Sequence, residues 1–278
     1  MRQPMSSAVL SPFCVRSLRV VLAAMFALAA APLAHTASPA VDTLISRLPN
    51  PDQWQKSPLE SALNEPGVND PLMRALQNDV RRKDIRGALR DVRALSTQYP
   101  KSAAMHYLHG VFCMIGRQFF EAESAFRRVT VLQPKKAPGW HALGMALVMQ
   151  GRYGDSLVPL RRAVQEAPRN HVVVTQLGMC YLKAGRPADG EATCRQALKI
   201  KNDFSPSWDV LGLCLRQEGR RAEALNAFDR ATKTPPTNLS AWTHLAETLH
   251  ASGRHAEADA ANERARQIYL KVANSHRR

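Results

Sequence analysis

The chain lacks the residue patterns that most enzyme active sites require. Its 278 residues contain no Walker loop, no G-x-S-x-G motif, no H-E-x-x-H motif and no glycine-rich nucleotide loop after a strand. The carboxylates are scattered among basic residues, so no pair of acidic residues stands out as a general acid and base. We therefore expect a protein that is not an enzyme and that binds no cofactor.

Cysteine and aromatic residues are scarce as well. There are five cysteines and no C-x-x-C pair, which argues against a redox motif and against a zinc clip. Aromatic residues form 6% of the chain and are not interleaved with the basic residues, so we expect no nucleic-acid partner. For three of the cysteines the sequence leaves two alternatives: Cys180, Cys194 and Cys214. Two of them form a disulfide, or all are buried thiols that act as small apolar side chains.

The apolar run near the amino terminus is too short to cross a bilayer. It extends from Val20 to Leu33 and has 14 residues, whereas a membrane-spanning helix needs about 18–20. Arginines precede the run and small residues follow it, which is typical of a secretory signal peptide. We therefore expect residues 1–37 to be a signal peptide, cleaved within 34–40, and the mature protein to be periplasmic or secreted. The alternative is an uncleaved anchor or a misassigned start.

A Gly-Arg pair recurs through the rest of the chain. After the first interval its glycines keep a constant spacing of about 34 residues: Gly116, Gly151, Gly185, Gly219 and Gly253. Before each pair, apolar residues recur at i, i+3, i+4 and i+7, which indicates one face of a helix, and a second helical pattern follows. A fixed period of this length is typical of an array of stacked helical hairpins.

The recurring positions resemble the pattern of the tetratricopeptide repeat family, W-x2-L-G-x2-Y followed by A, F, A and P. One repeat carries them as Trp140, Leu143, Gly144, Leu147, Ser156, Leu160, Ala163 and Pro168. The repeats that match well are 137–170, 171–204, 205–238 and 239–272, whereas 69–101 is degenerate. The resemblance implies an all-α fold, a right-handed α-solenoid of about five to six helix-turn-helix repeats over residues 69–272.

The repeat at 102–136 matches if its turn contains one extra residue. In that register Met105, Leu108 and Phe112 take core positions, and His109 stands where a small residue belongs. Outside the array, the proline-containing segment 41–68 is expected to form a short helix and a linker. Residues 273–278 are expected to be a frayed tail.

The resemblance also implies that one face of the first helices lines a concave groove. Carried over position by position, the groove residues are His106, Met114, His141, Met145, Val148, Met149, Met179 and Leu182. Exposed methionine and valine are costly in water unless something covers them. We therefore expect a scaffold or chaperone of the periplasm or envelope, serving secretion or pilus assembly, that binds an apolar peptide or helix of another protein. The alternatives are that segment 41–68 fills the groove, or that a register error has moved core residues onto it.

The same wall carries histidine, cysteine and methionine, which are ligands for soft metals. His106 and Cys113 are seven residues apart, about 10 Å along a helix, whereas ligands must lie about 2.0–2.3 Å from one ion. We therefore expect no bound metal.

Basic residues outnumber acidic ones, 38 to 23, and give a formal net charge of +15. Stacking would place the turn arginines in a row along one edge: Arg117, Arg152, Arg186, Arg220 and Arg254. Such a row would suit an acidic partner or an anionic envelope surface, so the alternative function is a structural adaptor. The competing interpretation is that these arginines are simply solvated.

Overall fold

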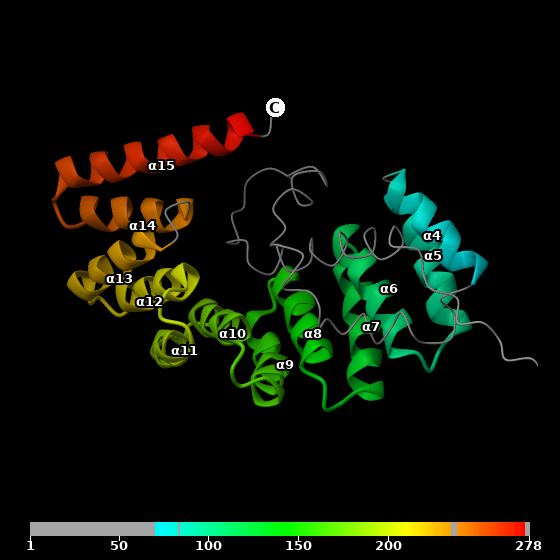
Figure 1. The fold of residues 1–278 in the computed structure, drawn as a ribbon. Helices are drawn as coiled ribbons and strands as arrows, with labels where there is room; N and C mark the ends of the chain where they lie inside the picture. The colour runs from blue at the N-terminus through cyan, green and yellow to red at the C-terminus, as the bar shows by residue number, and fades with distance from the viewer. Residues whose placement is uncertain (1–69, 83, 235–237, 276–278) are drawn as a thin grey trace, which may run out of the picture. The chain divides into compact units, whose positions relative to one another are not determined.

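The computed structural model describes residues 70–82, 84–234 and 238–275, which form helices joined by short turns (Figure 1). The predicted signal peptide with its cleavage region, the segment 41–68 and residues 276–278 of the tail lie outside the described residues. Within the described part there is no strand, and no helix is both long and apolar enough to cross a membrane.

The chain divides into two units, which are described separately. The first, Met1–Pro134, contains α4 (Pro71–Arg81), α5 (Ile85–Gln98), α6 (Ala103–Ile115) and α7 (Phe119–Leu132). The second, Lys135–Arg278, contains eight described helices. They are α8 (Ala137–Met149), α9 (Tyr153–Glu166), α10 (His171–Lys183), α11 (Pro187–Ile200), α12 (Ser205–Gln217), α13 (Arg221–Lys233), α14 (Leu239–His250) and α15 (His255–Ser275).

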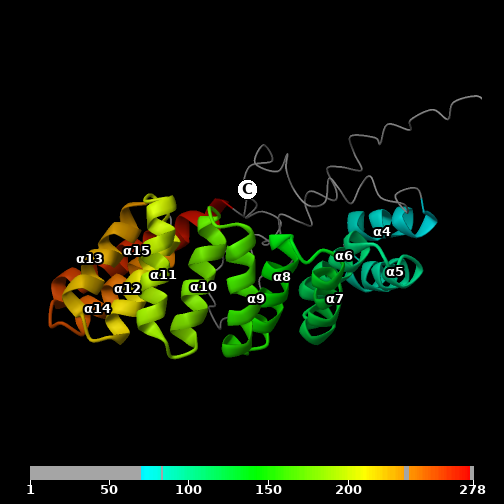
Figure 2. The same cartoon turned by 90° about the horizontal axis from the view of Figure 1, so that it is seen from below.

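Within each unit the helices pair as hairpins and the hairpins stack in chain order. The partners are α4 with α5 and α6 with α7 in the first unit, then α8 with α9 and so on to α14 with α15 in the second. Figure 2 shows α8 to α11 side by side in this order. The described helices thus form six hairpins, and the predicted all-α solenoid of five to six repeats is confirmed.

In the hairpins α8–α9 and α12–α13, close approach of the two helices depends on a glycine in the first helix. A Cβ atom added to Gly144 would lie 2.6 Å from Leu160 Cγ, and one added to Gly212 would lie 2.5 Å from Phe228 Cε1. Leu160 and Phe228 are completely buried, so each fills the space that a larger residue would need. The resemblance placed glycine at these two positions, and the packing explains why only a residue without a side chain fits there.

The turn inside each hairpin needs a residue with a left-handed backbone. Gly151, Gly185, Gly219 and Gly253 have φ values between 75° and 80°, a region in which glycine has no Cβ penalty. In the first unit Arg117 takes this conformation, with φ of 59°.

The extra residue expected in the turn of the 102–136 repeat is not there. From Ala103 onward first helices begin at one constant interval, and from Ile85 onward second helices begin at the same interval. Three residues separate α6 from α7, just as three separate α8 from α9. The Gly-Arg pair is instead displaced by one position, so that Gly116 is the C-cap residue of α6 and Arg117 occupies the place of Gly151. The predicted register of α6 was therefore wrong by one residue.

The corrected register gives new roles to residues of α6. Gly110, and not His109, takes the small-residue position, because a Cβ there would lie 2.5 Å from Phe126 Cε1. His106 takes the tryptophan position and donates from Nε2 to the carbonyl of Pro100 (3.0 Å), as Trp208 donates to that of Asn202 (2.7 Å).

Three residues expected in the core of α6 are buried for a different reason. Met105, Leu108 and Phe112 are at most 2% exposed, and they pack with Val92 and Leu95 of α5. They therefore pack against the preceding hairpin.

Candidate functional site

The candidate site lies on the first helices of the second unit, α8, α10, α12 and α14. Equivalent residues of these helices form rows, because each helix begins one full repeat after the previous one. We call the surface formed by the ninth residue of each helix and its neighbours the first-helix face, with Met145, Met179, Leu213 and Glu247 as its central row.

Polar side chains join each first helix to the next. The hydrogen-bonded pairs are His141 with Gln176, Thr175 with Ser207 (2.6 Å), Asp209 with His244 (2.8 Å) and Arg216 with Glu247 (2.9 Å). Burial lowers the pKa of His141, while its hydrogen bond to Gln176 raises it. These residues hold neighbouring helices together, so the predicted groove residue His141 has a structural partner.

Three predicted groove residues are buried and are corrected here. Val148 and Leu182 are 4% and 7% exposed, because Val148 packs against Tyr181 of the next first helix and Leu182 packs against Leu215. Met114, in the first unit, is 5% exposed. The twelfth residue of a first helix is therefore covered by the stacked hairpin when the next first helix places an apolar side chain against it.

The accessible apolar part of the face is its central row. Met145, Met179 and Leu213 are half-buried, each resting on an apolar cluster beneath it, and the row ends at the exposed Glu247. Met149 is half-buried as well. Leu213 was not among the predicted site residues, although it lies one repeat after Met179 and the periodicity alone would have found it.

The turn arginines of the second unit do not form a row of unopposed charges. Each pairs with the acidic residue three positions later: Arg152 with Asp155 (2.8 Å), Arg186 with Asp189 (2.7 Å), Arg220 with Glu223 (2.6 Å) and Arg254 with Glu257 (2.6 Å). The hydrogen bond from each arginine lowers the pKa of Glu223 and of Glu257. The acid lies in the first turn of a helix, where the helix dipole also favours negative charge.

Arg220 has two further carboxylates near it, Glu191 (2.7 Å) and Glu218 (3.1 Å). Arg117, the remaining member of the predicted edge, is an exposed turn residue of the first unit. Each turn arginine of the second unit therefore has a negative charge directly beside it.

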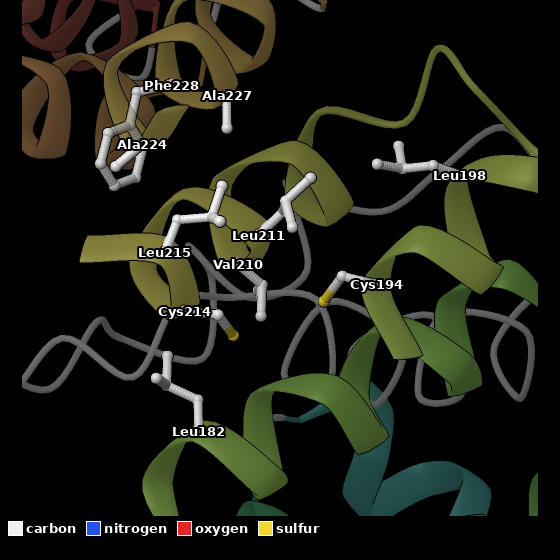
Figure 3. Close-up of a cluster of buried hydrophobic side chains, with 10 residues drawn as sticks. All are labelled: Leu182, Cys194, Leu198, Val210, Leu211, Cys214, Leu215, Ala224, Ala227 and Phe228. Atoms are coloured by element: carbon white, nitrogen blue, oxygen red, sulfur yellow. The ribbon is translucent and has the colours of Figure 1, made fainter. Parts of the chain in front are cut away.

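The described cysteines are buried free thiols: Cys113, Cys180, Cys194 and Cys214. Figure 3 shows Cys194 of α11 and Cys214 of α12 within one apolar cluster that also holds Leu182 and Phe228. The neighbouring Cys214 thiol and burial both raise the pKa of Cys194. Thiols of this kind are poor nucleophiles, because the reactive species is the thiolate.

These features define a class of protein, a helical-repeat array that keeps one face of its first helices half-exposed. Family comparison matches tetratricopeptide repeats over residues 147–213 and again over 210–269. Residues 147–269 therefore consist of tetratricopeptide repeats. No curated protein matches the chain.

Solved structures share this fold. The chain is 20% identical to the MamA protein, with a TM-score of 0.55, covering 60% of this chain and 91% of that one. For MamA 41-end from Desulfovibrio magneticus RS-1 the identity is 14% and the TM-score 0.54, covering 61% and 96%. YrrB, a TPR protein, is 17% identical with a TM-score of 0.50, covering 64% and 91%. The fold and the family support a scaffold for protein–protein interaction.

Proposed function

We propose that the first-helix face binds an apolar or amphipathic segment of another protein, and that the chain serves as a non-catalytic scaffold or chaperone of the periplasm. The observation that carries this proposal is the half-buried central row of Met145, Met179 and Leu213. Methionine adapts its shape to different apolar partners, so a row of this kind suits a peptide or a helix better than a small polar ligand.

The surroundings of the row favour an apolar contact over a charged one. Asp209 and Arg216 on either side already pair with His244 and Glu247, so a charged ligand would compete with these partners for them. The paired turn arginines make the adaptor alternative weaker for the same reason. The structurally similar YrrB has an unusual peptide-binding site, which makes peptides the first ligand class to test.

The experiment uses the chain without residues 1–40 and fluorescent amphipathic peptides, helical and extended, as probes. Fluorescence anisotropy would measure their binding to the wild type and to a Met145→Glu/Met179→Glu variant. Buried glutamate in the bound interface is costly, so we expect the variant to lose at least about 100-fold in affinity. Far-ultraviolet circular dichroism would verify that both proteins remain helical.

The matched control is Val158→Glu, because Val158 is 62% exposed on the second helix α9. It introduces the same charge on a different surface and should leave binding unchanged. Retained binding in the double variant would refute the proposal. Binding that collapses when ionic strength rises would instead favour the adaptor function, because salt screens exposed charges. Export would be tested by fusing residues 1–40 to a phosphatase that is active only outside the cytoplasm.

A further inference from the structure

Three side chains with metal-ligating atoms converge in the first unit. His109 and Cys113 lie four residues apart on α6, and therefore on one face of the helix, while Glu121 comes from the first turn of α7. The ligating nitrogen, sulfur and oxygen atoms all lie within 4.8 Å of one another. Cys113 is fully buried, whereas the side chains of His109 and Glu121 are 12% and 31% exposed, so the cluster can be reached from the side of Glu121.

The repeat pattern gives no structural reason for this cluster. In the corrected register, His109 and Cys113 take the places that Leu143 and Leu147 hold in the next repeat, and the later repeats have leucine or tyrosine there. A hairpin core thus has nitrogen and sulfur donors where its neighbours have apolar side chains. Burial of such groups costs stability unless they gain a partner.

Glu121 also differs from its equivalents. It occupies the place of Asp155 and Glu223, which pair with the arginine immediately before their helix, but in α7 that preceding residue is Gln118. Glu121 therefore accepts two hydrogen bonds from Arg93 instead, Nε to Oε1 (2.8 Å) and Nη2 to Oε2 (2.7 Å). Arg93 holds the carboxylate in position next to His109.

The hydrogen bonds of His109 show which proton a cation would replace. Nε2 lies 3.0 Å from Glu121 Oε1, which can only accept, so without a metal Nε2–H donates to this carboxylate. Nδ1 lies 3.1 Å from Ser96 Oγ, which is also 2.9 Å from the carbonyl of Arg93. A hydroxyl can donate or accept, so this arrangement also suits the other tautomer. When a cation takes the place of the Nε2 proton, the ring proton moves to Nδ1, Nδ1–H donates to Ser96 Oγ, and Ser96 donates to Arg93.

We propose that His109 Nε2, Cys113 Sγ and a Glu121 oxygen bind one borderline-soft divalent cation of the Zn²⁺ class. Nitrogen, sulfur and carboxylate donors are the set that Zn²⁺ prefers, and a fourth, open position would take water. Metal-bound histidine usually donates its other ring N–H to a neighbouring group, and Ser96 Oγ, 3.1 Å from Nδ1, is the group that would accept this hydrogen bond. This site is separate from the first-helix face and does not depend on the function proposed for it.

Binding requires a small closure and the loss of one proton. Ligands about 2.0–2.3 Å from a tetrahedral ion lie about 3.3–3.7 Å apart, so the donors must approach by about 1 Å. Cys113 binds as the thiolate: the S–H bond breaks, a sulfur–metal bond forms and the proton leaves to solvent. Because the thiol must lose this proton before the sulfur can bind, we expect affinity to increase with pH. The Arg93 charge beside the ion should keep the affinity moderate.

The experiment titrates Co²⁺, a spectroscopic substitute for Zn²⁺, into the full chain. We expect one ion per chain, visible d–d bands of a tetrahedral site and a near-ultraviolet sulfur-to-cobalt band, all reversed by Zn²⁺. Cys113→Ser should abolish the sulfur band. Cys180→Ser, which removes another buried thiol, should retain it. Ser96→Ala should weaken Zn²⁺ binding about tenfold, because Ser96 only orients the ring.

Two results would overturn the proposal. One is a sulfur-to-cobalt band that does not depend on Cys113, either because the wild type lacks the band or because the band survives in Cys113→Ser. The other is a nuclear magnetic resonance signal from an Nε2–H proton of His109 that persists with excess Zn²⁺, because it would show that a proton still occupies the place of the ion. If Cys113→Ser does not fold, Glu121→Gln serves in its place, and it should lose Zn²⁺ binding while it keeps the helical circular dichroism of the wild type.

Discussion

The two kinds of glycine in the repeat predict different responses to the same substitution. Gly212 lies inside α12, where an added Cβ would meet Phe228 Cε1 at 2.5 Å, whereas ordinary contact begins near 3.4 Å. Gly219 lies in the following turn with φ of 80° and has open space around the missing Cβ. Gly212→Ala therefore tests packing, and Gly219→Ala tests backbone conformation.

The structure sets the expected magnitudes. Alanine in a helix interior gains about 1 kcal/mol over glycine, but overpacking a full core costs about 1–3 kcal/mol, and a displacement near 1 Å belongs at the upper end. We expect Gly212→Ala to lower the free energy of unfolding by about 2 kcal/mol. For Gly219→Ala, the left-handed backbone costs about 1–2 kcal/mol, and the smaller entropy of the unfolded chain offsets part of it, so we expect a loss of about 0.5–1 kcal/mol.

Urea unfolding followed by far-ultraviolet circular dichroism would measure both losses. The critical comparison repeats each substitution in a Phe228→Val background, because valine lacks the Cδ1, Cε1 and Cζ atoms that meet the added Cβ. We expect Gly212→Ala to become nearly neutral there, a coupling of about 1–2 kcal/mol, and Gly219→Ala to remain additive. A Gly212→Ala chain as stable as the wild type, or one with no coupling to Phe228, would refute the close packing of α12 and α13.

Two further perturbations follow from the same coordinates. Arg117→Gly should stabilise the fold by about 0.5–1 kcal/mol, since it relieves a left-handed arginine, and an unchanged urea midpoint would contradict this. Because burial lowers the pKa of His141, the unfolded chain takes up the proton first as pH falls, so stability should decrease between about pH 7.5 and 5.5. His141→Gln should reduce this slope, and an unaltered slope would contradict the assignment.

Periodicity predicted most of the fold because the same residue types recur at the same positions in several repeats. Helix starts recur at one interval, and four of the five turn glycines have the left-handed backbone that glycine allows. The failure at α6 came from trusting one Gly-Arg pair over the period itself. Arginine rarely adopts a left-handed backbone, so the displaced pair predicted one extra residue in the turn. That extra residue shifted the predicted register of α6 by one position.

The site was predicted less well because burial depends on the neighbouring hairpin. Val148 and Leu182 are covered because apolar residues of the next first helix lie against them, and Met145 and Met179 remain accessible although they are only three residues earlier. A family pattern predicts the direction in which a side chain points, but it does not predict the size of the neighbouring side chain that covers it. The register error also concealed His109, which in the wrong alignment looked like a misfit and in the correct one stands beside Cys113 and Glu121.

Charge composition misleads for a related reason. A net charge of +15 suggested a basic edge, yet each turn arginine of the second unit lies three residues before an acid on the same helical turn. This spacing can be read from the sequence as R-x-x-D or R-x-x-E, and it forms a local pair before any stacking occurs. The exception is instructive, because α7 is preceded by Gln118 and its acid, Glu121, turns toward His109 and Arg93 instead. Glutamine in the place of one arginine thus changes a surface ion pair into a candidate metal ligand.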